Sequence, residues 1–335
     1  MVLRAPAEVT TRPLEWEDVP APEPGDHEVL VRVERCGVCR TDLHVVEGDL
    51  PPLRPTVIPG HEIVGRIVSV GREVRSLAVG ERVGIPWLRS TCGHCEYCVA
   101  SRENLCASKR FTGYTDNGGY AEYATGAEGY VFPLPNSEAA SLAPLLCAGI
   151  IGYRALKLAL PRPGGRIGFF GFGGSAHLTL QLAAKLGYET VAYSRNPTHL
   201  ELAMRLGATA SVLAGTSGAA SRPPSLDGAV VFAPAGPVVL DALSELKKGG
   251  RLSIASIHMS PIPEIDYDRL VFGERTIVGV ESNTREDARE FLDLATRLGL
   301  ESTVRVRPLR EANETLAALK AGDVVGAAVL DCTSG

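Results

Sequence analysis

The N-terminal part of the chain alternates hydrophobic and polar positions with the two-residue period of a β-strand. In HEVLVRVERCGVC, Val29, Val31 and Val33 alternate with polar residues, which is typical of a strand with one buried face. The stretches 61–71 (HEIVGRIVSVG) and 80–86 (GERVGIP) predict further short strands bounded by glycines. Helical periodicity is scarce before residue 138, so we predict a β-rich region here.

From residue 138 onward the pattern becomes helical and then alternates. EAASLAPLLCAGIIGYRALKLAL predicts a long apolar helical segment that is interrupted near Pro144. A buried-strand pattern, GGRIGFFGFGG, then precedes the helical SAHLTLQLAAKLG, which has Gly187 as its C-terminal signal. The alternation continues through ETVAYS, PTHLELAMRLGA, DGAVVFAPA, PVVLDALSELKKGG, RLSIASI and RTIVGV. Strands alternating with helices of about 12 residues indicate βαβ units and a parallel sheet covered on both faces.

These patterns predict an α/β protein with two domains. The length of 335 residues fits two domains of roughly 150 residues. We place a β-rich domain over residues 1–148 and 285–335, whose tail holds an amphipathic helix and short strands. A doubly wound domain with a parallel sheet is predicted over 149–284, and residues 215–228 predict a surface loop within it.

Composition and charge narrow the class of protein. The chain is 45% hydrophobic and 22% charged, as is usual for globular proteins. Its formal net charge of −5 argues against a nucleic-acid partner or an acidic membrane surface. The sequence has no run of about 18 apolar residues and no apolar core of a secretory signal near its N-terminus. We therefore expect a cytoplasmic protein without a membrane span.

Half of the eight cysteines lie in one short stretch, STCGHCEYCVASRENLCA. Cys92, Cys95, Cys98 and Cys106 have the spacing C-x2-C-x2-C-x7-C, which can bring four thiolates to one tetrahedral Zn²⁺. Four protein ligands close the coordination shell, so such a zinc is structural. Two disulfides or free thiols are the alternatives, and both are less typical of clustered cysteines in a reducing compartment. His94 lies inside the stretch and is expected to be solvated.

A second set of potential metal ligands is spread over three segments. GVCRTDLH offers Cys39, PGHEIVG offers His61 and Glu62, and PLLCAGIIGY offers Cys147. Two cysteines and one histidine are a known ligand set for catalytic zinc, which keeps one position open. Each segment alone is a weak signal, because a lone cysteine in an apolar helix, such as Cys147, is more often a buried structural residue.

The stretch GFGGSAH predicts a dinucleotide-binding turn. Gly171, Gly173 and Ala176 form the pattern G-x-G-x-x-A between a predicted strand and a predicted helix, and Gly174 lies in the same turn. The first glycine permits a tight turn, and the second lets backbone N–H groups approach a pyrophosphate at the helix N-terminus. An ordinary tight turn between strand and helix is the alternative.

Taken together, these motifs resemble those of a known family nearly end to end. With GGYAEY and KKGGRL added, the chain resembles the zinc-dependent alcohol dehydrogenases of the medium-chain dehydrogenase/reductase superfamily. The resemblance implies a GroES-like catalytic domain with a structural-zinc lobe and a Rossmann cofactor domain. WLRSTCGHCEYC is similar to the tetrameric microbial branch, which implies a homotetramer, with a dimer as the alternative.

The resemblance also implies two zinc ions per chain and reversible hydride transfer between an alcohol and a nicotinamide. Cys39, His61 and Cys147 would bind the catalytic zinc, with Glu62 as an occasional fourth ligand and Asp42 orienting His61. Thr41 would hydrogen-bond the substrate oxygen, and the alcohol proton would pass through the nicotinamide ribose to His44. Cys36 and Cys332 match no ligand position.

Further positions are implied to contact cofactor or substrate. Arg40 would meet the pyrophosphate, and backbone groups near Ile257, His258 and Glu281 would face the nicotinamide, whereas Ile151 departs from the threonine of many relatives. Trp87 matches a position that lines and narrows the substrate pocket, and Leu50 replaces a tryptophan and widens it. We therefore expect small to medium primary alcohols and aldehydes as substrates.

The end of the second Rossmann strand, VAYSRNPTH, bears on the choice of cofactor. Ser194 stands where relatives place the acidic residue that bonds the ribose 2′-OH, and Arg195 follows it. Without a carboxylate to repel a 2′-phosphate, and with a guanidinium to pair with one, NADP(H) is favoured over NAD(H). His199 could assist. The alternative is that Arg195 stacks on the adenine and both cofactors are accepted.

Two other functions remain open at this point. One is a polyol, amino-alcohol or other secondary-alcohol dehydrogenase of the same fold, which would call for more polar pocket residues. The other is a non-catalytic zinc-binding or redox-sensing protein, which would require that a ligand, the relay or the cofactor turn be missing.

Overall fold

The computed structural model describes residues 1–159, 164–215 and 225–333, so most of the predicted loop 215–228 lies outside the described residues. The chain forms two compact units. Unit 1 comprises Met1–Cys147, Ser282–Leu292 and Ser302–Gly335, and unit 2 comprises Ala148–Glu281 and Asp293–Glu301. The predicted domain bounds, 1–148 with 285–335 and 149–284, stay a prediction.

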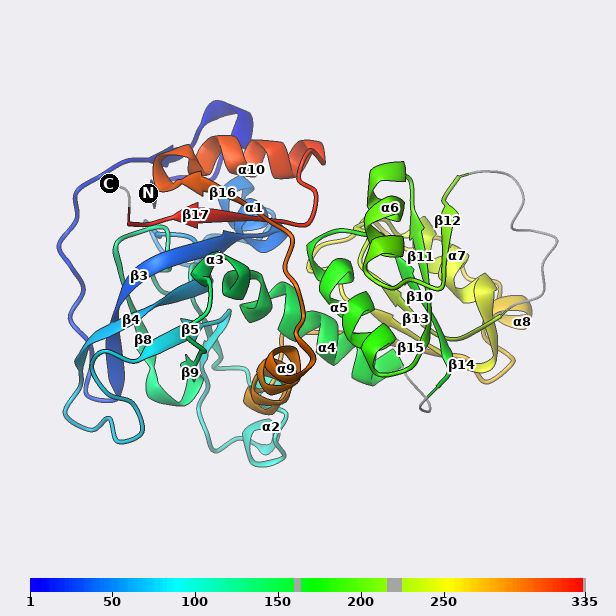
Figure 1. Cartoon of the computed structure of the whole chain (residues 1–335), viewed down its shortest axis with the longest axis horizontal. Helices are drawn as coiled ribbons and strands as arrows, with labels where there is room; N and C mark the ends of the chain where they lie inside the picture. Colours follow the sequence, from blue (N-terminus) through cyan, green and yellow to red (C-terminus); the bar gives the residue numbers. More distant parts are fainter. Residues whose placement is uncertain (160–163, 216–224, 334–335) are drawn as a thin grey trace. The chain divides into compact units, whose positions relative to one another are not determined.

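Unit 1 is built on a seven-stranded sheet in the order β16-β17-β3-β4-β5-β9, with β8 paired to β3 (Figure 1). The pairs of this sheet are antiparallel except β16 with β17. Its strands are β3 (Glu28–Val38), β4 (Glu62–Val70), β5 (Arg82–Ile85), β8 (Tyr123–Ala127), β9 (Phe132–Pro133), β16 (Val304–Pro308) and β17 (Ala327–Asp331). The predicted alternation in β3 is confirmed, because Val29, Val31 and Val33 are at most 1% exposed and lie in the core of this unit.

Short elements surround this sheet. Two small antiparallel pairs are β1 (Val2–Leu3) with β2 (Leu14–Glu15) and β6 (Leu88–Ser90) with β7 (Arg110–Phe111). The α-helices of this unit are α1 (Arg40–Glu47), α2 (Glu96–Val99), α3 (Ala139–Leu142) and α10 (Ala312–Ala321). The 3-10 helices are η1 (Val9–Thr11), η2 (Glu103–Leu105), η3 (Glu128–Tyr130), η4 (Ala143–Leu146) and η6 (Leu309–Glu311).

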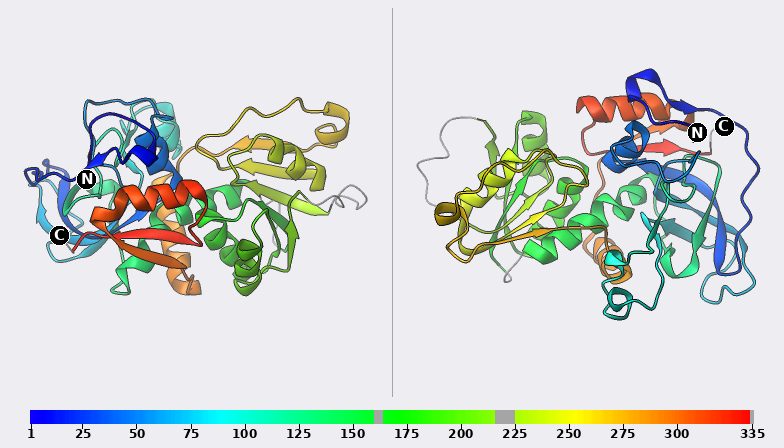
Figure 2. Two further views of the ribbon diagram at one scale, coloured as in Figure 1. Left: turned by 90° about the horizontal axis from the view of Figure 1, so that it is seen from above. Right: turned by 180° about the vertical axis from the view of Figure 1, so that it is seen from behind.

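Unit 2 is a doubly wound fold. Its six strands are parallel, in the order β12-β11-β10-β13-β14-β15, and the order reverses direction at β10. The strands are β10 (Arg166–Phe170), β11 (Glu189–Ser194), β12 (Ala210–Leu213), β13 (Leu226–Val231), β14 (Leu246–Ile254) and β15 (Thr276–Gly279). The helices are α4 (Ala148–Ala159), α5 (Gly174–Lys185), α6 (Pro197–Arg205), α7 (Pro237–Glu245) and α8 (Tyr267–Leu270). Since crossovers between parallel strands are right-handed, α5 and α6 cover one face and α7 covers the other (Figure 2).

The predicted helical segment 138–160 is divided among three elements. It consists of α3, η4 and α4, with Pro144 in η4 and a break at Cys147. Helix α9 (Arg285–Leu298) is the predicted amphipathic helix of the tail, and residues of both units belong to it. Of the described helices, none alone is long and apolar enough to cross a bilayer, although the bent pair Ala139–Leu146 with Ala148–Ala159 passes that test jointly.

Candidate active site and metal centres

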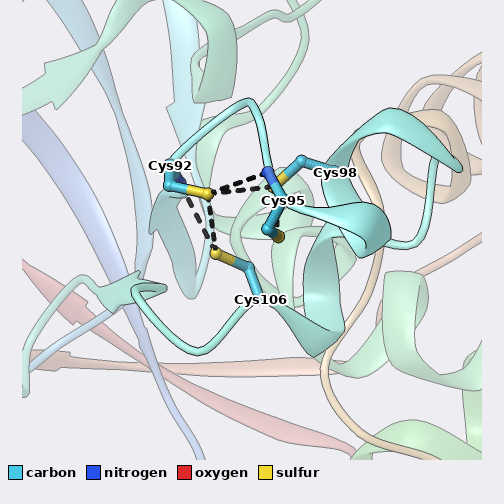
Figure 3. A group of neighbouring side chains, drawn as sticks. All are labelled: Cys92, Cys95, Cys98 and Cys106. Atoms are coloured by element: carbon cyan, nitrogen blue, oxygen red, sulfur yellow. Dashed lines mark hydrogen bonds between the residues drawn. The ribbon is translucent and has the colours of Figure 1, made fainter.

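The four clustered cysteines converge on one point in unit 1 (Figure 3). Their sulfurs are separated by 3.9 Å for Cys92 and Cys98, 3.5 Å for Cys95 and Cys98, and 3.6 Å for Cys92 and Cys106. Thiolates that each lie about 2.3 Å from one tetrahedral ion are about 3.8 Å apart, whereas a disulfide requires about 2.05 Å. The set therefore fits a closed, structural zinc site.

Backbone groups of the lobe favour the thiolate form of one of these sulfurs, that of Cys92. The N–H groups of His94 and Cys95 lower the pKa of Cys92 to about 6. His94 itself is exposed, and its Nδ1 lies 2.8 Å from the carbonyl oxygen of Cys92. The side chain of His94 is thus engaged within the lobe backbone and does not join the four sulfurs.

The lobe is tied to the rest of unit 1 by two polar contacts. Thr91 Oγ1 lies 3.4 Å from the sulfur of Cys98 and 2.6 Å from the hydroxyl of Tyr130. Glu103, which is 2% exposed, accepts hydrogen bonds from the backbone N–H and the Nε of Arg285 at 2.9 and 3.1 Å. The zinc loop is therefore anchored both to η3 and to the start of α9.

A second donor set lies where α1, β4 and the end of η4 approach one another. Cys39, His61, Glu62 and Cys147 present ligand atoms that all lie within 4.8 Å of one another. The sulfur of Cys39 is 3.2 Å from Nε2 of His61 and 3.9 Å from the sulfur of Cys147. These separations fit two thiolates and an imidazole around one zinc ion, with a carboxylate within reach as a fourth donor.

Asp42 holds two members of this donor set, His61 and Cys39, by hydrogen bonds. Its side chain is 1% exposed, and its Oδ1 accepts hydrogen bonds from Nδ1 of His61 at 3.0 Å and from the N–H of Gly60 at 3.1 Å. Its Oδ2 accepts from the N–H of Cys39 at 2.9 Å. Because Nδ1 of His61 donates to Asp42, Nε2 is the nitrogen left to face a metal. Burial acts to lower the pKa of His61, but the charges of Asp42 and Cys39 raise it well above its usual value.

The pKa values of Cys39 and Cys147 are shifted in opposite directions. Burial acts to raise the pKa of Cys39, but the thiol of Cys147 and the neighbouring His61 lower it well below its usual value. The hydrogen bond to Cys39 and burial raise the pKa of Cys147 well above its usual value. Metal ligands of this type bind as thiolates, so a metal ion bound here would favour the deprotonated form of both sulfurs.

Glycine residues make room for this site. Gly37 pairs with Glu62 across β3 and β4, and a Cβ at residue 37 would overlap the carboxylate of Glu62. Gly60 has φ +97°, and a Cβ there would lie against Tyr120 and 2.8 Å from the sulfur of Cys36. Both glycines are thus required by close approach at the ligand-bearing turn.

Thr41 and His44 lie on α1, directly after Cys39. Thr41 and His44 are each 8% exposed, and Nδ1 of His44 lies 2.8 Å from Oδ2 of Asp49. The indole of Trp87 meets the ring of His61 edge-on, with centroids 4.9 Å apart, and it stacks on Phe111 at 4.6 Å. Trp87 thus lies directly beside the second donor set.

The glycine turn has the geometry of a phosphate-binding loop in unit 2. Gly171 follows β10 with φ +89°, and a Cβ there would lie 2.8 Å from the backbone nitrogen of Ala233. Gly173 precedes α5 in extended conformation, with open space where its Cβ would be, so nothing blocks the helix N-terminus. Ala176, in the first turn of α5, is fully buried.

The predicted cofactor-selecting residues follow the neighbouring strand. Ser194 ends β11, and its Oγ accepts a hydrogen bond from the N–H of Asn196 at 3.1 Å. The N–H of Gly171 donates to the carbonyl oxygen of Tyr193, so the glycine turn and Ser194 lie at the same edge of the sheet. Arg195 is exposed, and burial lowers the pKa of the half-buried His199.

Comparisons with known proteins decide the family. A family model described as alcohol dehydrogenase GroES-like domain matches residues 25–136, and one described as zinc-binding dehydrogenase matches residues 174–297. The chain is 49% identical over 335 residues to a probable alcohol dehydrogenase, AdhA, of Mycobacterium tuberculosis, covering 98% of this chain and 95% of that protein. The chain belongs to the zinc-type medium-chain alcohol dehydrogenase family.

Further relatives agree with this assignment. The dehydrogenase is 38% identical to an alcohol dehydrogenase of Geobacillus stearothermophilus over 95% of its own length and 96% of that protein. Its fold matches that of a cinnamyl alcohol dehydrogenase from Sorghum bicolor with a TM-score of 0.90 at 28% identity, covering 100% of this chain and 98% of that one. The predicted family and the predicted fold class, a GroES-like with a Rossmann-type domain, are confirmed. The protein is an alcohol oxidoreductase that uses NAD(P).

The site residues predicted for the dehydrogenase divide between the two units. Within unit 1, the structure brings the members of each proposed zinc-ligand set together. The same unit holds the predicted relay, pyrophosphate and pocket residues Arg40, Thr41, His44, Leu50 and Trp87. Unit 2 holds Gly171, Gly173, Gly174, Ala176, Ser194, Arg195, His199, Ile257 and Glu281. Ile257 follows β14 and Glu281 follows β15, both at the carboxyl end of the parallel sheet, and Ile257 is 44% exposed. Sequence reasoning missed Gly37, which faces Glu62 on the neighbouring strand, and Asp49, which lies five positions after His44 and just beyond the helix cap Gly48.

Proposed function

We propose that this dehydrogenase interconverts small to medium primary alcohols and their aldehydes, with a catalytic zinc and with NADP(H) preferred over NAD(H). The observation that carries the zinc assignment is the convergence of Cys39, His61 and Cys147, with the orientation of His61 fixed by Asp42. Two thiolates and one imidazole leave one of four tetrahedral positions for an oxygen ligand. The four sulfurs of the lobe would hold a second, structural zinc.

The residues of unit 1 have distinct roles in this reaction. When bound, zinc supplies a Lewis acid that lowers the pKa of a coordinated hydroxyl, and the nicotinamide supplies the hydride acceptor. Cys39, His61 and Cys147 hold the metal, and Glu62 is a reserve ligand. The hydroxyl of Thr41 orients the substrate oxygen by a hydrogen bond, and His44 takes up the released proton.

The substrate range follows from the groups beside the metal ligands. Trp87 is held by its stack on Phe111 and by its edge contact with His61, so its indole is a rigid wall. Leu50 is half-buried and packs against the same hydrophobic core. An apolar lining of this kind favours substrates with alkyl or aryl groups over polyols. Because a hydrophobic pocket discriminates between substrates by only about 1–3 kcal/mol per methylene, we expect a broad range of alcohol and aldehyde substrates. By resemblance we also propose a homotetramer in the cytoplasm.

The cofactor preference rests on the end of β11. Ser194 adds no charge there, and Arg195 is exposed and able to pair with a 2′-phosphate. Arg40 would contact the pyrophosphate of the cofactor. The loop around the pyrophosphate would consist of Gly171, Gly173, Gly174 and Ala176. The backbone near Ile257 and Glu281 would face the nicotinamide. His199 lies one turn into α6 and would be a further donor to the phosphate.

An initial-rate comparison tests this cofactor assignment. We expect the native enzyme to reduce small aldehydes with a higher kcat/KM for NADPH than for NADH. Ser194→Asp should reverse the preference, because a carboxylate repels the 2′-phosphate and can bond a free ribose hydroxyl. Ser211→Asp adds the same charge at an exposed position of β12 and should leave the ratio unchanged. Equal or better rates with NADH in the native enzyme would reject the preference.

A further inference from the structure

Tyr114 connects the two residues proposed to set the width of the substrate pocket. Its ring stacks on the indole of Trp87, with centroids 5.9 Å apart and 16° between the ring planes. Its hydroxyl donates a hydrogen bond of 2.6 Å to the carbonyl oxygen of Pro51, the residue directly after Leu50. Tyr114 and Leu50 both pack against the hydrophobic core that includes Trp87. One side chain therefore contacts one wall of the proposed pocket and holds the backbone of the other.

The segment that Tyr114 holds, residues 51–56 (PPLRPT), has few other attachments. It forms neither helix nor strand, and three of its six residues are prolines, which have no N–H to donate. Among the described residues, the bond from Tyr114 is the only hydrogen bond that reaches this segment, and the nearest bonds on either side are made by the N–H groups of Leu50 and Val57. Because Leu53 is 62% exposed, side-chain packing does not hold the middle of the segment either.

The turn that carries Tyr114 is itself well fixed. The N–H of Thr115 donates to the carbonyl oxygen of Phe111 at 3.1 Å, and Oγ1 of Thr115 accepts from the N–H of Phe111 at 2.7 Å. Gly113 has φ +77°, and a Cβ there would lie 2.8 Å from the backbone nitrogen of Gly60, so the turn lies against the backbone beside the second donor set. Burial raises the pKa of Tyr114 above its ordinary value of 10.0, so its hydroxyl stays protonated and can donate at neutral pH.

We propose that Tyr114 is a positioning residue for substrate selection, which rests on the proposed function of the site. Its hydroxyl keeps Leu50 and Pro51 at a fixed distance from Trp87, and this distance limits the width of the alcohols that reach the metal ligands. A hydrogen bond of this kind shifts an equilibrium by roughly 2- to 10-fold. Without it, residues 51–56 are free to move away from Trp87, so wider substrates gain more than narrow ones.

Removal of the hydroxyl alone tests this role. Tyr114→Phe keeps the ring that stacks on Trp87. We expect kcat/KM for benzyl alcohol, divided by kcat/KM for ethanol, to rise by roughly 2- to 10-fold, because the benzyl group is the wider of the two. Tyr123→Phe is the matched control and should keep the native ratio, because the hydroxyl of this half-buried tyrosine in β8 makes no hydrogen bond among the described residues. A ratio that is unchanged or lower in Tyr114→Phe, including equal losses for both alcohols, would overturn the proposal.

A second background shows whether Tyr114 acts through Leu50. In Leu50→Ala the side chain that Tyr114 positions is already removed. Tyr114→Phe should therefore change the same ratio by less than about twofold in this background. A change as large as that seen with native Leu50 would overturn the proposal.

Hydrogen exchange gives a readout that does not depend on turnover. The N–H of Leu50 donates to the carbonyl oxygen of His44 at 3.2 Å, one residue before the carbonyl that Tyr114 binds. We expect this N–H to exchange roughly 2- to 10-fold faster in Tyr114→Phe and at the native rate in Tyr123→Phe. An unchanged exchange rate in Tyr114→Phe would overturn the proposal. Absence of turnover with every alcohol would reject the proposed function, and the selecting role with it, whereas turnover with an unchanged ratio rejects the role of Tyr114 alone.

Discussion

Single residues fix the catalytic ligand set more tightly than its spacing in the sequence suggests. Asp42 makes three hydrogen bonds that hold His61, Gly60 and Cys39 in one arrangement. Gly37 is also required by the packing here, because the carboxylate of Glu62 occupies the space that a side chain at residue 37 would need. The proposed ligands were predicted from short motifs, whereas Gly37 acts through its register partner Glu62 on another strand.

Gly37→Ala should affect stability and metal binding together. The added methyl group would overlap Glu62, and overpacking of this kind costs typically about 1–3 kcal/mol in the free energy of unfolding. We also expect weaker retention of the catalytic zinc, because Glu62 and the adjacent His61 must shift. Urea unfolding and metal analysis of the purified protein measure the two effects.

Two further variants show whether the overlap is the cause. Gly279→Ala places a methyl group where nothing lies within 4 Å, at a strand residue of β15, and should change stability by less than about 0.5 kcal/mol. Glu62→Ala removes the carboxylate, which makes the closest overlap, and leaves only Cβ of residue 62 at 2.8 Å, so the double variant should recover part of the stability that Gly37→Ala loses. A double variant that is less stable, with additive losses, would mean that the overlap is not the cause.

At the scale of elements, the lobe of the four cysteines is held by hydrogen bonds to its surroundings in unit 1. Its 3-10 helix η2 carries Glu103, whose carboxylate receives two hydrogen bonds from Arg285 at the start of α9. Arg285 also lies over the ring of Tyr130, with its guanidinium 5.2 Å from the centroid. The zinc loop, η3 and α9 therefore form one connected cluster.

The pH dependence of stability should report this cluster. Burial acts to raise the pKa of Glu103, but the N–H and guanidinium of Arg285 lower it below its ordinary value of 4.5. A lowered pKa in the folded state contributes stability that is fully present above about pH 4.5 and is lost as the pH falls through the folded value. Glu103→Gln should cost about 1–3 kcal/mol at neutral pH, and this difference should shrink below about pH 4.5.

Urea unfolding of native and variant protein from pH 8 to about pH 3 covers the range in which the difference should shrink, and protonation of the four cysteines affects both proteins alike. Glu286→Gln, at an exposed position in the same turn of α9, is the control and should stay within about 0.5 kcal/mol of the native protein at every pH. A Glu103→Gln difference that grows as the pH falls would contradict the assignment.

The elements themselves could largely be predicted from periodicity. The strand-like valines of β3 and the strand–helix alternation of unit 2 are both found in the structure. β14 begins at Leu246, earlier than the predicted RLSIASI, because Gly249 and Gly250 lie within the strand rather than ending it. In this part of β14 the pairing register with β13 shifts between Leu226 and Gly228. Such a shift depends on the partner strand, so it could not be predicted from the sequence of β14 alone. β12 was not singled out, since its four residues alternate between half-buried and exposed.

At the scale of the whole molecule, the two units have separate hydrophobic cores and separate parts of the chemistry. Family motifs predicted the ligand sets and the glycine turn, because each motif is a short, recognisable stretch even where the stretches of one set are far apart in the chain. Contacts between residues that meet only through topology could not be predicted in this way. The pairing of Glu103 with Arg285, 182 positions apart, and the division of α9 between the units are of this kind.

The central claim is that Cys39, His61 and Cys147 hold a catalytic zinc distinct from the zinc of the four-cysteine lobe. Zinc content and alcohol oxidation, measured on the same preparations of native protein, Cys147→Ala and Cys332→Ala, test it most directly. We expect about two zinc ions per native chain, about one in Cys147→Ala together with loss of turnover, and native values for Cys332→Ala, whose buried thiol belongs to neither ligand set. A Cys147→Ala enzyme that keeps two zinc ions, or that still oxidises alcohols at the native rate, would contradict the account.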